Sequence, residues 1–98
     1  MTRLYSISFL PQPLIGTHPV VIDNKLGTMG DWIRFSTQQW FIWTDRSKAN
    51  VQAEITASIV SGDQVIVVAI APEFAQGAAP QWIWNWLNDK MNKQMLGL

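Results

Sequence analysis

Apolar and polar residues alternate in several short stretches of the chain, a pattern typical of half-buried β-strands. In residues 4–10, a tyrosine, an isoleucine and a phenylalanine share one face, and serines lie between them. Residues 32–35 and 38–44 predict two further strands with a tight connection between them. Residues 64–71, QVIVVAIA, form a continuous apolar, β-branched run. That run predicts a fourth strand, largely buried on both faces.

Two segments between these strands carry apolar residues at helical spacing. The first stripe consists of Ile22, Leu26 and Met29. The second consists of Val51, Ile55 and Ile59. We expect Thr17 to cap the first helix, with Pro19 in its first turn and Gly30 at its end. Ser47 is the expected cap of the second helix.

The C-terminal stretch PQWIWNWLNDKMNKQML has features of both a strand and a helix. Its three tryptophans alternate, which would suit a strand. Pro80 suits a helix start, however, and the residues after Trp86 are good helix formers without β-branching. As a helix, the stretch has a broad apolar arc formed by Ile83, Trp84, Leu87, Met91 and Met95. Trp82 and Trp86 lie on the flank of that arc.

The order of the expected elements is β-α-β-β-α-β followed by a helix. This order predicts an α+β fold of the ferredoxin-like type, in which two helices cover one face of a four-stranded antiparallel sheet. We expect residues 1–75 to form the ferredoxin-like domain. Residues 76–98 are the expected C-terminal helical extension, packed on the same domain.

The stretch QWFIWTD, residues 39–45, places apolar side chains on both faces of its strand. Trp40 and Ile42 point one way, and Phe41 and Trp43 point the other way. Two helices cover only one face, so the second needs the tail helix or a second copy of the chain. We therefore predict that the interaction residues are Trp40, Ile42, Trp43, Trp82 and Trp86. The strand register decides which of Trp40 and Trp43 lies in the helix-side core.

Composition and charge narrow the possible functions. The 98 residues suit one domain, 48% are hydrophobic and only 14% are charged. The net charge is zero and the cations form no run, which argues against non-specific nucleic-acid binding. Because cysteine is absent, a disulfide framework, a thiol nucleophile and a cysteine-based zinc site are excluded. We expect a cytoplasmic protein without a signal peptide, and no stretch approaches the roughly 18 apolar residues of a membrane span.

Candidate catalytic residues are few. His18 is the only histidine and has no metal-ligating residue at suitable spacing. Asp31, Asp45 and Asp63 all fall at the ends of expected elements, where aspartates commonly form turns and caps. We therefore predict no catalytic residue, no metal site and no cofactor.

The phrase GDWIRFSTQQWFIWTDRSKANVQAEITASIVSGDQVIVV carries a resemblance to a known group of proteins. A Gly-Asp-Trp turn precedes a short strand, a TxxWxIxTD strand leads into a serine-capped helix, and SGDQVIVV begins the last strand. Over residues 4–90 this resembles small SinR-like bacterial and phage proteins. These are distantly similar to the second CRISPR-associated adaptation subunit and to VapD-type toxins.

The resemblance implies a ferredoxin-like homodimer built through the sheets. In the CRISPR-associated relatives, an aspartate at the end of the first strand of each protomer is linked to metal-dependent nuclease activity. Ser8 stands at about that position here, and the stretch YSISFLPQP contains no acid. This difference argues against nuclease activity.

We interpret the chain as a non-enzymatic homodimeric interaction or scaffold module, which could also bind another protein. Two alternatives stay open. One is a metal-dependent endonuclease or toxin-like ribonuclease in which Asp31, Asp45 or Asp63 supplies the missing acid. The other is a nucleic-acid-binding scaffold without cleavage, in which aromatic residues near Arg34 and Arg46 stack on bases.

Overall fold

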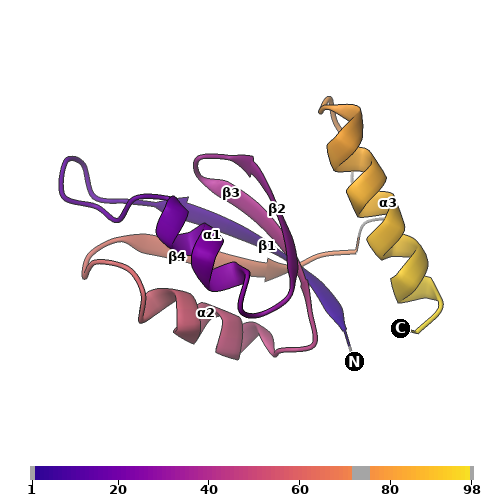
Figure 1. The fold of residues 1–98 in the computed structure, drawn as a ribbon, viewed down its shortest axis with the longest axis horizontal. Coiled ribbons are helices and arrows are strands. Elements are labelled where there is room, and N and C mark those ends of the chain that lie inside the picture. Colours follow the sequence, from indigo (N-terminus) through magenta and orange to yellow (C-terminus); the bar gives the residue numbers. More distant parts are fainter. Residues whose placement is uncertain (1, 72–75, 98) are drawn as a thin grey trace.

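The first strand occupies the interior of a four-stranded antiparallel sheet (Figure 1). The computed structural model describes residues 2–71 and 76–97. The strand order is β2-β3-β1-β4, so β2 and β4 form the two edges. The strands are β1 (Arg3–Leu10), β2 (Asp31–Ser36), β3 (Gln39–Thr44) and β4 (Gln64–Ala69). The prediction of an α+β fold with a four-stranded antiparallel sheet is confirmed.

Within the described residues, three helices accompany the sheet: α1 (Val20–Leu26), α2 (Lys48–Thr56) and α3 (Gln81–Met95). Ser47 caps α2 as predicted, because its hydroxyl accepts a hydrogen bond from the Asn50 amide at 3.1 Å. The tail is a helix, also as predicted. Figure 1 shows α3 set apart from α1 and α2, near the end of the sheet where β1 begins.

Two predictions about the first helix are wrong. Thr17 does not cap α1, since its hydroxyl accepts a hydrogen bond from the Val60 amide at 2.7 Å. That bond ties the loop after β1 to the turn before β4. Gly30 does not end the helix, because α1 ends at Leu26 and a non-helical turn connects it to Gly30.

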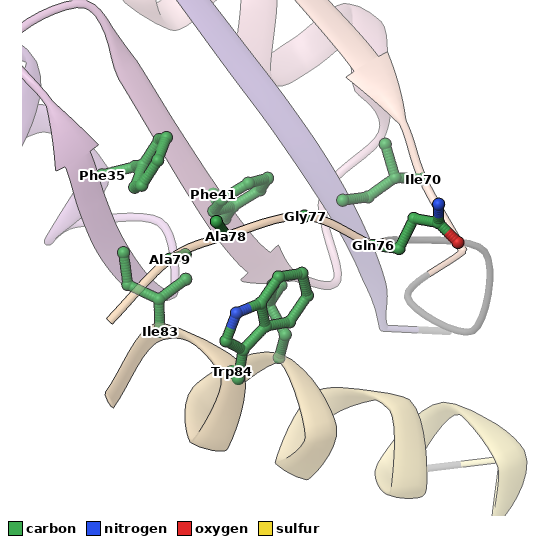
Figure 2. A pocket seen from close by; sticks show the side chains of 10 residues that line it. Phe35, Phe41, Ile70, Gln76, Gly77, Ala78, Ala79, Ile83 and Trp84 are labelled. Carbon is green, nitrogen blue, oxygen red and sulfur yellow. The ribbon is translucent and has the colours of Figure 1, made fainter. Parts of the chain in front are cut away.

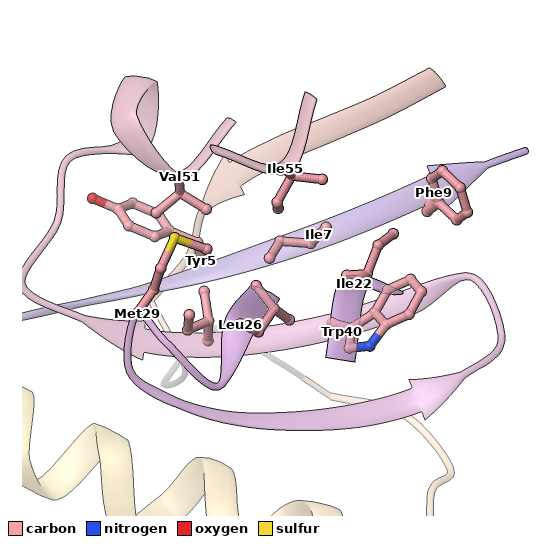
Figure 3. Packing of buried hydrophobic residues seen from close by; sticks show 10 residues of the cluster. Tyr5, Ile7, Phe9, Ile22, Leu26, Met29, Trp40, Val51 and Ile55 are labelled. Atoms are coloured by element: carbon pink, nitrogen blue, oxygen red, sulfur yellow. The ribbon is translucent and has the colours of Figure 1, made fainter. Parts of the chain in front are cut away.

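The helix-side core fills the space between the sheet and the pair α1 and α2 (Figure 3). It consists of Tyr5, Ile7, Phe9, Ile22, Leu26, Met29, Trp40, Ile42, Val51 and Ile55. Trp40 is its largest fully buried side chain. The Trp40 indole N–H donates to the Asp23 carboxylate at 2.8 Å, and its ring meets Phe9 edge-on at 6.2 Å. The ring of this tryptophan is therefore buried among apolar side chains, and its N–H has a hydrogen-bond acceptor.

A second cluster, the α3-side cluster, lies on the opposite face of the sheet. Leu4, Trp43, Ile83 and Leu87 are its buried members. The apolar arc predicted for the tail therefore contacts the sheet through Ile83 and Leu87, whereas Met95 is exposed. The α3-side cluster answers the question raised by QWFIWTD, since α3 covers the second face above Trp43.

The prediction that residues 64–71 form a strand buried on both faces is wrong. On the second face of β4, Ile66 is 62% exposed and Val68 is 49% exposed. The reason is positional, because β4 is an edge strand and the helix that covers the second face packs on Leu4 and Trp43. An uninterrupted apolar run therefore lies partly on the surface.

Candidate functional site: an uncovered sheet face and its edge

Helix α3 covers only one end of the second face of the sheet. The remainder, which we call the open half, consists of Ser6, Ser8, Leu10, Gln39, Gln64, Ile66 and Val68. None of these residues is charged. A hollow of about 420 Å³ lies at its far end, between Leu10, Ser36 and Ile66. The open half therefore combines exposed aliphatic side chains with neutral polar groups.

A short hydrogen-bonded row crosses the centre of the open half. The Ser8 hydroxyl donates to the Gln39 side-chain oxygen at 2.7 Å. The Gln39 side-chain nitrogen in turn donates to the Ser6 hydroxyl at 2.6 Å. These polar groups satisfy one another, so burying them against a partner leaves few unmet hydrogen bonds. Ser8 therefore belongs to a neutral hydrogen-bonded row.

The outer edge of β4 presents backbone groups that no described strand pairs with. The Ile70 amide donates to the Leu4 carbonyl at 3.0 Å. Backbone direction alternates along an antiparallel strand, so the amides of Val65, Val67 and Ala69 point away from β1. Edge strands are commonly protected by lysine, proline or a bulge. The β4 sequence QVIVVA contains no charged residue and no proline.

The opposite edge of the sheet differs from β4. β2 carries Asp31 and Arg34, and its register against β3 shifts between Arg34 and Ser36. Charged side chains and a register irregularity both discourage pairing with another strand. Of the two edges, only β4 therefore lacks these protective features.

A buried lysine holds α3 in place. The Lys90 side chain is 3% exposed, and its ammonium contacts the Asp31 carboxylate at the start of β2 and that of Asp89 at 3.1 Å. It also lies 5.1 Å from the centre of the Trp86 ring. Burial lowers the pKa of Lys90, but the hydrogen bonds that its ammonium donates to Asp31 and Asp89, with the attraction of these carboxylates, outweigh burial and raise the pKa overall. The ammonium is therefore charged and links α3 to the sheet.

Replacing Asp31 and replacing Lys90, each in a separate variant, should lower the free energy of unfolding by different amounts. Asp31→Ala leaves the buried ammonium with Asp89 alone and should lower the free energy of unfolding by about 1–3 kcal/mol. Lys90→Met keeps the apolar stem and returns the 55% exposed Asp31 to water, so its cost should stay below about 1 kcal/mol. Chemical denaturation of both variants at pH 7 measures the difference. An equal loss in both would contradict this role for the buried ammonium.

The raised pKa also predicts a pH dependence. The stabilisation from Lys90 is fully present below the ordinary lysine pKa of about 10.4 and is lost as pH rises through the higher folded value. Stability should therefore decline above this pH more steeply in the wild-type protein than in Lys90→Met. Parallel curves for the two proteins would argue against the linkage.

The structure distributes the five predicted interaction residues over three environments. Trp40 and Ile42 lie in the helix-side core and have no exposed surface, so the strand register resolves in favour of Trp43 on the second face. Trp43 lies beneath α3 and is nearly buried. Trp86 is half-buried against the α3-side cluster, and Trp82 is 54% exposed. Among the five, Trp82 presents the most surface to a partner.

Two of the three aspartates considered for metal binding, Asp31 and Asp63, make other contacts. The Asp63 carboxylate accepts hydrogen bonds from the backbone amides of Gln12 at 2.8 Å and Thr17 at 3.0 Å. The first of these bonds is the main cause of the lowered pKa of Asp63. Asp31 contacts Lys90, as described above, and Asp45 is exposed. No group of three or more histidine and acidic side chains suited to a metal occurs within the described residues.

Arg34 and Arg46, the arginines considered for nucleic-acid binding, lie outside the open half. Arg34 forms an ion pair with Asp23 at 3.3 Å, on the helix-side face of the sheet. The Arg46 guanidinium donates to the Asn50 side chain at 3.2 Å. Neither arginine belongs to the open half. His18 accepts a hydrogen bond from the Val20 amide through Nδ1 at 3.2 Å.

Comparison with other proteins adds no family to this description. A scan of protein-family models finds no match to the chain, and searches of curated proteins and of solved structures find none either. Within residues 2–71 and 76–97, no helix has the length and apolar character needed to cross a membrane.

Proposed function

We propose that the chain is a non-enzymatic, cytoplasmic interaction module that pairs with a second copy of itself. The fold we propose for it is ferredoxin-like. Supporting this, β3 lies between the two strands that flank α1, and β1 lies between the two strands that flank α2. The resemblance seen in the sequence implies a dimer built through the sheets.

The unprotected edge of β4, next to Ile66 and Val68, is the observation that carries the proposal. Antiparallel pairing of β4 with β4 of a second copy joins the two sheets and gives partners to the outward amides of Val65, Val67 and Ala69. The same pairing brings the two open halves side by side. Exposed Ile66 and Val68 then gain cross-strand neighbours from the second copy near the two-fold axis and lose part of their contact with water.

A second copy fits this surface better than a charged partner does. In a two-fold dimer, the same patch meets itself, so any charge on it faces a like charge. The open half and β4 carry no charged residue, so self-association brings no such repulsion. An acidic or basic partner, in contrast, finds no complementary charge on this surface.

A lysine at the proposed interface should separate the two copies. We expect Ile66→Lys to raise the dimer dissociation constant at least tenfold, or about 1.4 kcal/mol. Two-fold symmetry places two added charges near the axis, and lysine protects strand edges. The control is Ile15→Lys, an identical change at a residue of similar exposure, 66%, in the loop after β1. Light scattering between low and high micromolar concentration measures the mass.

The wild-type protein and Ile15→Lys should both reach twice the 11.1 kDa mass of the chain. Ile66→Lys should approach that mass only at concentrations at least tenfold higher than the wild-type protein needs. A wild-type protein that stays at one chain mass throughout would contradict the proposal. Equal dimerisation of the two variants would exclude the β4 edge as the interface.

A further inference from the structure

A cavity of about 310 Å³ lies between the second face of the sheet, residues 76–79 and α3 (Figure 2). It is separate from the open half. The side chains that line it include Phe35, Phe41, Ile70, Ile83, Trp84 and Leu87. Figure 2 shows Phe35 and Phe41 projecting from the sheet and Trp84 projecting from α3. Three aromatic rings from three separate elements therefore surround one space.

The lining is almost entirely apolar. Among the lining residues within the described part of the chain, Gln76 supplies the only polar side chain that is not aromatic, and none is charged. Water in such a space makes few hydrogen bonds and is readily displaced by an apolar molecule. A charged ligand, in contrast, would lose its hydration without gaining an opposite charge. The lining thus favours a neutral ligand.

Size and wall shape narrow the ligand class further. An apolar protein cavity of roughly 150 Å³ is large enough to bind benzene. The cavity here is about twice as large, so it has room for two or three fused or linked rings. Flat rings pack favourably against aromatic walls, either stacked or edge-on. The Trp84 indole N–H and the Gln76 amide offer a few polar contacts to such a ligand.

We propose that this cavity binds a small, neutral, flat aromatic molecule of about two or three rings. The site is built by the docking of α3, because Ile83 and Leu87 serve both the α3-side cluster and the cavity wall. It does not depend on the proposed dimer, since Ile66 and Val68 are not among its lining residues.

Two fluorescent probes with the same ring skeleton test the proposal. N-phenyl-1-naphthylamine is neutral, and 8-anilinonaphthalene-1-sulfonate adds one negative charge to that skeleton. We expect saturable binding of one neutral probe per chain, at least tenfold tighter than binding of the sulfonate. If the neutral probe shows no saturable binding at concentrations up to about 100 μM, the proposal is overturned. Equal affinity for the two probes would indicate generic surface adsorption and would overturn it as well.

Variants and NMR locate the bound probe. Phe35 lines the cavity and is itself 46% exposed. Phe35→Lys therefore places a charge in the cavity wall and should weaken binding of the neutral probe at least tenfold. Ile15→Lys and Ile66→Lys should bind it within twofold of the wild-type protein. Retained binding in Ile66→Lys separates this site from the dimer interface. Unchanged binding in Phe35→Lys would overturn the location.

The indole N–H resonances give a readout that requires no variant. The chain has six tryptophans. Trp84 lines the cavity, whereas Trp40 lies in the helix-side core on the other face of the sheet. Adding the neutral probe should shift the Trp84 indole resonance most and leave that of Trp40 unchanged. A shift confined to other tryptophans, such as exposed Trp82, would contradict the proposed site.

Discussion

Replacing Trp40 with alanine should lower the free energy of unfolding by about 3–5 kcal/mol, the largest stability effect that we expect. The side chain is fully buried in the helix-side core and contacts Phe9 edge-on. Its removal leaves a large cavity between the sheet and the two helices. It also takes away a hydrogen-bond donor from the Asp23 carboxylate. Because small domains have only about 5–15 kcal/mol of stability, this loss approaches the whole margin.

Trp82 provides a matched control for Trp40. It is also a tryptophan, but it is exposed near the start of α3. Trp82→Ala should change the free energy of unfolding by less than about 0.5 kcal/mol. Urea denaturation followed by circular dichroism compares both variants with the wild-type protein. If Trp82→Ala were as destabilising as Trp40→Ala, the division between buried and exposed tryptophans would be incorrect.

The second large effect concerns the docking of α3. Leu87→Ala should weaken the contact between α3 and the sheet by about 2–5 kcal/mol, because Leu87 packs with Leu4 and Trp43 in a small cluster that has few other buried members. The helix should then separate locally before the sheet unfolds. Hydrogen exchange of the α3 amides measures this opening directly.

The control for this experiment is Leu96→Ala, since Leu96 lies just beyond α3 and is exposed. In the Leu96→Ala variant, the α3 amides should exchange at the wild-type rate. Exchange in Leu87→Ala should accelerate in α3, while the core amides of β1 keep their protection. Equal acceleration in α3 and β1 would mean that the helix and the sheet unfold as one unit.

Local sequence signals were sufficient for most elements. Ser47 predicted the start of α2 because capping depends on residues within one turn. The tail was predicted as a helix because the residues after Trp86 favour helix over strand. The cap prediction for Thr17 is wrong because its partner, the Val60 amide, lies far along the chain. Capping patterns contain no information about such distant partners.

The candidate surface was less accessible from the sequence. An apolar run does not reveal whether its strand lies at an edge, so the exposure of Ile66 and Val68 required the strand order. The sequence does contain a signal for the burial of Lys90. Lys90 follows Ile83 by seven residues and Leu87 by three, so it continues the buried stripe of α3. A pattern of apolar residues does not predict that a lysine is buried, because burial of its charge depends on Asp31 from another element.

The cavity under α3 could not be predicted from sequence. Its walls come from β2, β3, α3 and two segments around the connection between β4 and α3. The sequence indicated that Phe41 and the tail helix were apolar, and it indicated that a second face needed cover. Whether that cover fills the space depends on the distance between α3 and the sheet, which no local pattern encodes.

Pairing of two chains through the β4 edge should change amide exchange along that strand. The exchange rates of Val65, Val67 and Ala69 are measured by NMR at concentrations below and above the dimer dissociation constant. We expect these three outward amides to exchange slowly only at the higher concentration, whereas the outer amides of β2 keep their rates. Unchanged rates on β4, or new protection on β2 instead, would contradict the proposed dimer.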